Sequence, residues 1–572
     1  MEPIWTDIEG VLVVGAGAAG LRAAIAVRDA GQHALVLSSR RRDDAHTVLA
    51  AGGINAVLGT RDPEDSWQQH CVDTYHEGRG LSDPRAAQLL AREAPDAIIE
   101  LERWGCPFAR TADGRIDQRY FGAHRYRRTC YVDDRTGRAV LDTLVERALQ
   151  QGVEVRELLY VTRLIVADGR CRGVVAFDLT DGRRHVLLAD AVVLAAGGHS
   201  GLWDRTSSRG HENMGEGMAL AMRAGCRVRD LEFVQFHPSG MVEPEAQAGT
   251  LVSEAVRGEG AHLLNNQGER FMARYDPDRM ELSTRDQVAY ATHTEIAEGR
   301  GTEHRGVWLD ATHLGREAIE ERLPETAAKF REVGIDIASE KMEIAPTAHY
   351  SMGGVVVDAD TQATDVEGLY AAGEVTGGLH GANRLGGNSL AETVVFGRRA
   401  GAAAARQAPA PRVVEAIQAE VEEAARELDD ILAGQSEGLA PVERELGAVL
   451  TSSCGVVRCA DGLKQGLDRL QSLWSQRSSG NGHAVNVNEY AVRVLRLRSA
   501  MLVAEVTIRS AAERTETRGA HIREDHPEPY SEPQRTLARR RPDGAIEMSH
   551  DVVPSLPPSL AELEAAQEAP NQ

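Results

Sequence analysis

The chain has 572 residues, of which 42% are hydrophobic and 26% are charged, a composition typical of a soluble globular protein with about two to four domains. Its 64 Lys and Arg residues against 86 Asp and Glu residues give a net charge of −22. This charge argues against binding to nucleic acid or to an anionic membrane surface. An anionic small molecule would therefore need a local group of arginines.

The seven cysteines are never spaced C-x-x-C. This pattern is typical of a reducing compartment and predicts neither a zinc site nor an iron–sulfur site in this chain. No apolar run approaches the roughly 18 residues that a membrane span needs. The N-terminus also lacks the basic and apolar regions of a signal peptide. We therefore expect a protein that faces the cytoplasm and holds no metal of its own.

The first elements predict a nucleotide-binding unit. An apolar strand is expected at 11–14, followed by G-A-G-A-A-G, a helical pattern and a second strand at 34–37. Gly15 permits the tight turn, Gly17 lets the backbone approach a pyrophosphate, and Gly20 lets the helix pack closely on the strand. The pyrophosphate is expected at the N-terminus of the helix, where amide groups and the helix dipole favour an anion.

The second strand favours FAD over NAD as the nucleotide. It ends in S-S-R, where NAD-binding units usually carry an acidic residue. Two later stretches, 191–198 and 368–374, read as buried strands that end in glycines. We expect both to return to the same sheet and to complete a flavin site.

The stretch near 236–345 interrupts this unit and reads as a small α+β insertion over the flavin cleft, with a helix expected at 288–298. Helical patterns follow, and the end of the chain has few large apolar residues, which predicts a segment extended over a neighbour or disordered. The predicted fold class is α/β, a discontinuous Rossmann-like FAD-binding domain with an inserted α+β capping domain and a C-terminal helical domain. The predicted boundaries are 1–235 and 346–411 for the FAD-binding domain, 236–345 for the capping domain, 412–520 for the helical domain and 521–572 for a C-terminal extension.

Five motifs in a fixed order then identify a family. They are H-T-V-L-A-A-G-G-I, F-V-Q-F-H-P-S-G, S-E-A-V-R-G-E-G, P-T-A-H-Y-S-M-G-G and H-G-A-N-R-L-G-G-N-S-L. From Val11 to about Glu524 the sequence resembles the flavoprotein subunits of succinate dehydrogenase and quinol:fumarate reductase. The resemblance implies that succinate and fumarate are interconverted by hydride transfer to or from flavin N5. It also implies a partner protein with iron–sulfur clusters, a membrane anchor that exchanges electrons with quinone, and a peripheral position on the cytoplasmic side of the cell membrane.

The resemblance also implies roles for single residues in the reaction. The proton passes through Arg285, which is supplied by Glu254 and Arg257. Ser253 stands where the family usually has threonine, and it keeps the hydroxyl group. The residues that match the family's substrate contacts are Phe121, His237, Ser253, His349 and Arg384.

For the cofactor, the resemblance implies a covalent bond from His46 to the 8α carbon of the flavin. Such a bond raises the flavin potential enough for succinate oxidation in this family. Glu216 stands where the family commonly has aspartate. The other matching flavin contacts are Gly15, Gly17, Gly20, Ser38, Thr47, Ala51, Gly52, Glu374, Ser389 and Leu390.

Two alternatives have different chemistry. L-aspartate oxidases share the fold, but they hold flavin non-covalently and carry an acid where this chain has Phe121, so both His46 and Phe121 favour the dicarboxylate reaction. A scaffold subunit that binds FAD without catalysis would be expected to lose at least one polar site residue, and this chain keeps them all.

Overall fold

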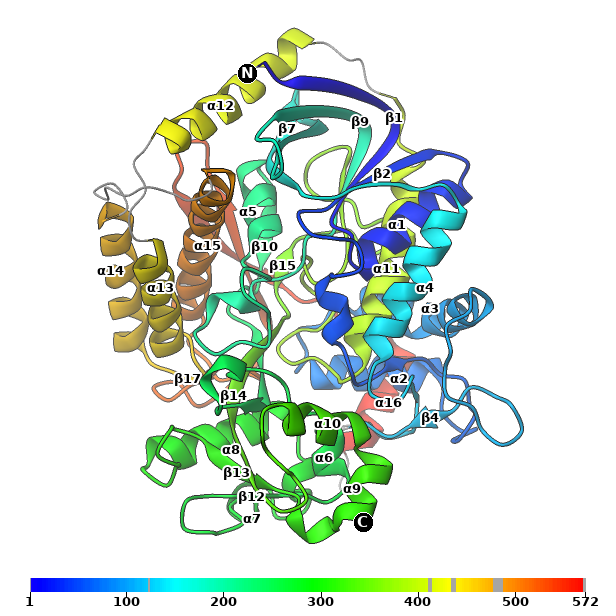
Figure 1. The fold of residues 1–572 in the computed structure, drawn as a ribbon, viewed down its shortest axis with the longest axis vertical. Coiled ribbons are helices and arrows are strands. Elements are labelled where there is room, and N and C mark those ends of the chain that lie inside the picture. The colour runs from blue at the N-terminus through cyan, green and yellow to red at the C-terminus, as the bar shows by residue number, and fades with distance from the viewer. Residues whose placement is uncertain (1, 122–123, 410–413, 434–438, 477–486, 569–572) are drawn as a thin grey trace.

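The computed structural model describes residues 2–121, 124–409, 414–433, 439–476 and 487–568, and its central element is a seven-stranded sheet (Figure 1). The order is β6-β2-β1-β9-β8-β7, and β16 also pairs with β9. β1, β2, β6, β9 and β16 run parallel, whereas β7 and β8 are antiparallel to their neighbours. The strands are β1 (Ile4–Val14), β2 (His33–Leu37), β6 (Glu154–Arg156), β7 (Leu159–Ala167), β8 (Arg170–Asp178), β9 (Arg184–Leu194) and β16 (Leu369–Ala371). The two late strands expected from the sequence thus return to the first sheet.

Helices cover one face of this sheet through close contacts between small residues. α1 (Ala18–Asp29) packs against α11 (Asn388–Ala404), although the two helices are far apart in the sequence. A Cβ atom at Gly20 would lie 1.9 Å from the carbonyl oxygen of Gly15, and one at Gly401 would lie 2.1 Å from that of Ala23. Only glycine allows these approaches. α3 (Pro84–Arg103) and α4 (Thr136–Gln150) complete this layer.

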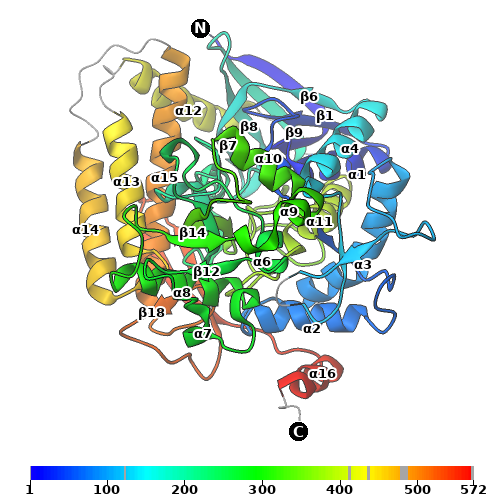
Figure 2. The same cartoon turned by 60° about the horizontal axis from the view of Figure 1, so that its bottom comes forward.

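The insertion forms a separate layer with its own apolar core (Figure 2, green). Its sheet has the order β11-β14-β13-β12. The neighbouring strands β11 and β14 are the first and last strands of the insertion, and they connect it to the rest of the molecule. The elements are β11 (Val234–Met241), α6 (Glu254–Gly258), β12 (His262–Leu264), α7 (Met272–Tyr275), α8 (Arg285–Ala297), β13 (Val307–Asp310), α9 (Arg316–Arg322), α10 (Pro324–Glu332) and β14 (Met342–Ser351).

The expected helical region lies on the other side of the sheet. It consists of α12 (Val414–Ala433), α13 (Leu439–Ser453), α14 (Ala460–Gln476) and α15 (Val487–Glu513). α15 packs against α5 (Glu216–Arg223), whose first residue lines the cavity described below. The boundary predicted at residue 411 lies outside the described residues.

The C-terminal extension, expected to be extended over a neighbour or disordered, lies over two other parts of the chain. β19 (Gln534–Arg540) and β20 (Ile546–Val552) form a hairpin, and β19 pairs with β10 (Arg227–Arg229). α16 (Pro558–Glu568) packs on α2 (Trp67–Glu77) through a few apolar side chains. Of the two alternatives, the described part of the extension fits the first, because pairing to an existing sheet edge orders a strand that has little apolar surface of its own. Within the described ranges, no helix is long and apolar enough to cross a membrane.

The short strands complete the description. They are β3 (Ile54–Asn55), β4 (Gln118–Arg119), β5 (Thr129–Cys130), β15 (Gly354–Val355), β17 (Val457–Arg458) and β18 (Ile522–Arg523).

Candidate active site

A cavity of about 890 Å³ lies between the carboxyl ends of the parallel strands and the inserted layer. Its volume suits a dinucleotide cofactor together with a small substrate. Residues from the first glycine loop, the insertion and the start of α11 line it together. Of the predicted site residues, those that line the cavity are Gly15, Gly17, Ser38, His46, Thr47, Ala51, Gly52, Phe121, Glu216, His237, Ser253, Glu254, Arg285, His349, Glu374, Arg384, Ser389 and Leu390.

Two predicted site residues do not line the cavity. Gly20 lies under α1, where it allows the helix to approach the turn at Gly15. Arg257 is buried behind Glu254 and donates to the backbone oxygen of Glu281. Both therefore act through neighbours that do line the cavity.

The nucleotide end of the cavity is the turn between β1 and α1. Gly17 is the N-cap residue of α1, and no side chain of its own caps the helix. Thr47 Oγ1 accepts a hydrogen bond of 3.1 Å from the backbone N–H of Ala18, which ties the predicted flavin segment to this turn. A Cβ atom at Gly17 would sit 3.5 Å from that same oxygen. A helix N-terminus beside a glycine turn suits a pyrophosphate.

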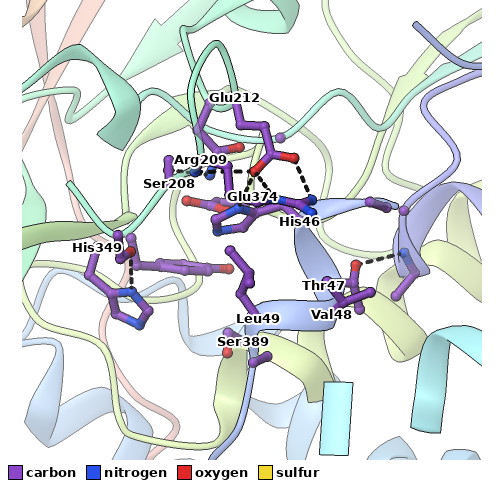
Figure 3. Close-up of a pocket in the computed structure, with 18 of the residues that line it drawn as sticks. His46, Thr47, Val48, Leu49, Ser208, Arg209, Glu212, His349, Glu374 and Ser389 are labelled. Carbon is purple, nitrogen blue, oxygen red and sulfur yellow. Dashed lines mark hydrogen bonds and ion pairs between the residues drawn. The ribbon is translucent and has the colours of Figure 1, made fainter. Parts of the chain in front are cut away.

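His46 lies on a 3₁₀ turn in the middle of the cavity, with its ring beside Glu212 (Figure 3). Its Nδ1 lies 3.1 Å from Oε2 of Glu212. Burial works to raise the pKa of Glu212, but hydrogen bonds from His46 and Arg209 outweigh burial and lower this pKa to about 2. An ionised carboxylate can only accept, so Nδ1 carries the proton and the lone pair of a neutral ring lies on Nε2.

Two arginines from different layers meet at the other end of the cavity. Arg285 Nη1 and Arg384 Nη2 donate to the same oxygen of Gln235, at 3.0 and 2.8 Å. The Nε of Arg384 is buried and has no hydrogen-bond partner within the described residues. Burial and the neighbouring Arg285 lower the pKa of Arg384 to about 10, so it is cationic at neutral pH. A carboxylate would satisfy the free donors of this pair.

Two histidines face the same region as neutral donors. His237 Nδ1 accepts a hydrogen bond of 3.2 Å from the backbone N–H of Ser239, so its Nε2 carries the proton. His349 Nδ1 pairs with Ser207 Oγ at 2.8 Å, and the two imidazole rings lie 5.5 Å apart. Burial holds the pKa of both rings well below the ordinary histidine value, with further lowering by neighbouring arginines. His237 can therefore present an N–H group without adding charge, and His349 adds no charge either.

Glu254 connects Arg285 with Arg257. Its Oε2 accepts from Nε and Nη2 of Arg285 at 3.0 and 2.9 Å, and its Oε1 lies 3.9 Å from Nη2 of Arg257. Burial works to raise the pKa of Glu254, but the two arginines outweigh burial and lower it. Burial lowers the pKa of Arg257. The result is a buried sequence of cation, anion and cation that ends at the cavity.

Phe121 occupies a slot made by two glycines. A Cβ atom at Gly52 or at Gly386 would come within 2.4 Å of the phenyl ring. The ring lies 5.7 Å from the guanidinium carbon of Arg285, a cation–π distance. Phe121 thus presents an apolar wall next to the arginine and no charge that could pair with an amine.

The remaining predicted residues have local roles that the structure makes visible. Ser253 caps α6 by accepting from the N–H of Ala255, and Glu374 accepts from the N–H of Ser351. Glu216 pairs with Arg496 at 3.1 Å, so its longer side chain reaches α15. Ser389 and Leu390 lie in the first turn of α11, as expected.

Sequence reasoning missed three side chains that hold the predicted ones. Gln235 holds both arginines, Glu212 orients His46, and Ser207 orients His349. Gln235 stands inside the F-V-Q-F-H-P-S-G motif, which was a usable signal. Glu212 and Ser207 lie in an irregular loop that carries no pattern. In the described part of the chain, no group of three or more His, Cys, Asp or Glu side chains could hold a metal ion.

Comparison with known proteins agrees with this geometry. The FAD binding domain family matches residues 10–390, and the fumarate reductase flavoprotein C-terminal family matches residues 443–553. A fumarate reductase (CoM/CoB) subunit of Methanothermobacter marburgensis is 42% identical over 93% of this chain and 97% of its own. The succinate dehydrogenase flavoprotein subunit of Rickettsia bellii is 38% identical over 91% and 90%.

Two solved structures share the whole fold. The E. coli quinol fumarate reductase flavoprotein FrdA superposes with a TM-score of 0.91 at 34% identity, covering 97% of this chain and 98% of the other. Mycobacterium smegmatis Sdh1 gives a TM-score of 0.87 at 37% identity, covering 99% and 97%. This chain therefore belongs to the family of FAD-dependent flavoprotein subunits of succinate dehydrogenases and fumarate reductases.

Proposed function

We propose that this chain interconverts succinate and fumarate in the cavity between the FAD-binding layer and the insertion. The observation that carries the proposal is the pair Arg285 and Arg384, two cations from different layers that share one acceptor and keep donors free beside two neutral histidines. A four-carbon dicarboxylate supplies the two negative ends that such a site needs. When bound, FAD would supply the hydride acceptor.

The protein groups would divide the remaining work. Arg384, His237, His349 and Ser253 would hold the two carboxylates, and Phe121 would exclude water from the reacting carbons. Arg285 would move the proton at the carbon next to the one that exchanges hydride. Glu254 and Arg257 would restore its protonation state, since a guanidinium that reacts once must be reset through a neighbour.

We further propose that His46 carries the flavin covalently. The hydrogen bond to Glu212 leaves the lone pair of Nε2 available to form the bond to the 8α carbon. Gly15, Gly17, Ser38, Thr47, Ala51, Gly52, Glu374 and the first turn of α11 would hold the rest of the cofactor.

Replacing Glu212 by Gln is expected to slow attachment by roughly 10²-fold, the lower end of what a positioned proton acceptor contributes. The amide can still accept from Nδ1, but it no longer stabilises positive charge on the imidazole. The measurement is the time course of flavin that stays with the chain after denaturation, starting from apoprotein and added FAD. Glu146→Gln, on the exposed side of α4, is the matched control. Equal time courses for the two variants would show that Glu212 has no part in attachment.

The electrons taken from succinate must pass from the flavin to another protein. Six of the seven cysteines are buried, and burial raises the thiol pKa of each of these six. We propose that a partner protein with iron–sulfur clusters accepts the electrons and that a membrane anchor couples this partner to quinone on the cytoplasmic side. The names of the relatives differ in the electron carrier that they give, which is quinol, ubiquinone or CoM/CoB.

The test combines activity with isolation. Purified chain should reduce an artificial electron acceptor with succinate and should not do so with L-aspartate. Affinity isolation from detergent-solubilised membranes should recover a partner with the absorbance of an iron–sulfur cluster. Turnover of L-aspartate with oxygen, or no turnover of succinate by a flavin-loaded complex, would refute the proposal.

A further inference from the structure

Four buried polar side chains, joined in a row by hydrogen bonds, lie next to the cavity without lining it. Its members are Glu77 at the end of α2, Asp286 in the first turn of α8, Asn383 before α11 and Gln235 on β11. Their residues are between 0% and 8% exposed. The side chain of Gln235 accepts hydrogen bonds from the guanidinium groups of both Arg285 and Arg384.

Asn383 joins the two carboxylates to Gln235. Its Nδ2 donates to Oε1 of Glu77 at 2.6 Å and to Oδ1 of Asp286 at 3.0 Å. Its Oδ1 accepts from Nε2 of Gln235 at 3.0 Å. Two acidic groups therefore share one amide nitrogen in a dry environment, where repulsion between two negative charges is strong.

The direction of the hydrogen bonds in this row of side chains is fixed at both ends of the row. A guanidinium can only donate, so Gln235 must present its oxygen to Arg285 and Arg384 and its nitrogen to Asn383. The backbone oxygen of Arg384 accepts from the same nitrogen at 2.9 Å and gives the same orientation. Asn383 must then point its own nitrogen at the acidic pair. A change of charge on the pair is thus transmitted through two amides to the two arginines.

The charged groups that face Glu77 come from two parts of the chain. Arg79 follows α2, whereas Asp286, Arg285 and Arg279 belong to the insertion. Arg79 Nη2 also lies 3.5 Å from Oδ2 of Asp286. Burial, and next the charge of Asp286, raise the pKa of Glu77 to about 7, whereas the three arginines lower it.

We propose that Glu77 is a titratable positioning residue whose proton is coupled to the occupation of the dicarboxylate site. This inference rests on the function proposed above and adds a regulation to it. With Glu77 protonated, the pair carries one negative charge fewer than with Glu77 ionised, and Arg285 and Arg384 are free to attract a dianion. With Glu77 ionised, its negative charge competes for the same arginines and weakens binding of the dianion.

The sign of the coupling follows from the charges. A bound dianion places negative charge near Arg285, which disfavours ionisation of Glu77 and raises its pKa further. Binding must therefore take up protons in the pH range between the pKa of the free site and that of the occupied site. The range begins near pH 7, because the pKa of Glu77 in the free protein is about 7.

The test uses flavin-loaded protein and malonate, a dicarboxylate that cannot lose hydrogen across two adjacent methylene carbons. Calorimetric titration in two buffers of different ionisation enthalpy measures the protons taken up per malonate. Above pH 7, wild-type protein should take up a fraction of a proton more per malonate than Glu77→Gln. At pH 5.5, where free malonate is itself partly protonated and releases a proton on binding as the dianion, the two proteins should give the same value. Glu77→Gln should remove this uptake, and the exposed variant Glu146→Gln should retain it.

Steady-state kinetics give a second measurement. The KM for succinate should rise severalfold from pH 6.5 to pH 8.5 in wild type and should stay flat over this range in Glu77→Gln. If Glu77→Gln does not fold, Glu77→Asp should move the pH at which wild-type uptake begins. Malonate binding without proton uptake in wild type, or equal uptake in Glu77→Gln, overturns the coupling alone. No malonate binding at any pH overturns the dicarboxylate site and the coupling with it.

Discussion

Replacing Arg285 by lysine is expected to lower the rate of succinate oxidation by about 10³-fold or more while the flavin stays bound. The guanidinium reaches Gln235 and Glu254 at the same time through three different nitrogens. A lysine ammonium is a single point on a flexible stem and cannot hold both partners and a substrate atom. The measurement is kcat with an artificial acceptor, together with the ratio of flavin to protein.

A matched control is available on the same layer. Arg316 forms an exposed ion pair with Asp336 at 2.5 Å, so Arg316→Lys keeps the charge at a surface site and should change the rate by less than about twofold. A loss of kcat with unchanged KM would assign Arg285 to the chemical step. A near-wild-type rate in Arg285→Lys would remove Arg285 from the proton path.

Replacing His46 by alanine is expected to abolish the covalent bond and with it most succinate oxidation. A nitrogen substituent on the 8α carbon withdraws electrons from the flavin and raises its potential, so its loss makes succinate too weak a reductant. Fumarate reduction, which runs downhill from a low-potential flavin, should decline much less. The cavity keeps its other contacts, so flavin should remain bound without the covalent bond.

Gel fluorescence and flavin absorbance together test this prediction. Wild-type chain should fluoresce as a flavin band in a denaturing gel, His46→Ala should not, and both should show flavin absorbance before denaturation. Thr47→Ser, which keeps the hydroxyl that accepts from Ala18, is the control at the adjacent position. A flavin-free wild-type band would refute covalent attachment and would leave the dicarboxylate site standing.

The sequence predicted the fold wherever the pattern was local. The glycines at 15, 17 and 20 identified the first βαβ unit, and the buried strands near 191–198 and 368–374 were expected to return to its sheet, as β9 and β16 do. The C-terminal helices lie in the region where helical patterns were expected. The sequence did not decide between a docked and a disordered tail, because β19 is ordered by pairing with β10 rather than by its own side chains.

In the candidate site, too, the sequence predicted some residues and missed others. Motifs identified the side chains that face the cavity, because their chemistry is distinctive. The residues that hold them, Glu212, Ser207, Asn383 and Glu77, come from loops and helix ends where polar residues are ordinary. Their contacts join positions as far apart as Glu77 and Asn383, and no local pattern records such a contact. The acidic pair could be found only in three dimensions.

β16 is synthesised long after the strand with which it pairs, β9, and this delay has a consequence during translation. Ribosomes add about 5–20 residues per second, so roughly 20 to 70 seconds separate the appearance of His46 from that of Arg384. During this interval the edge of β9 that later receives β16 is open, and α1 lacks its cover, α11. The nascent chain then has the glycine turn before α1 without Arg384 or the first turn of α11. We therefore expect the finished chain to bind FAD, and a chain that ends before α11 to leave the side of α1 that packs on α11 uncovered.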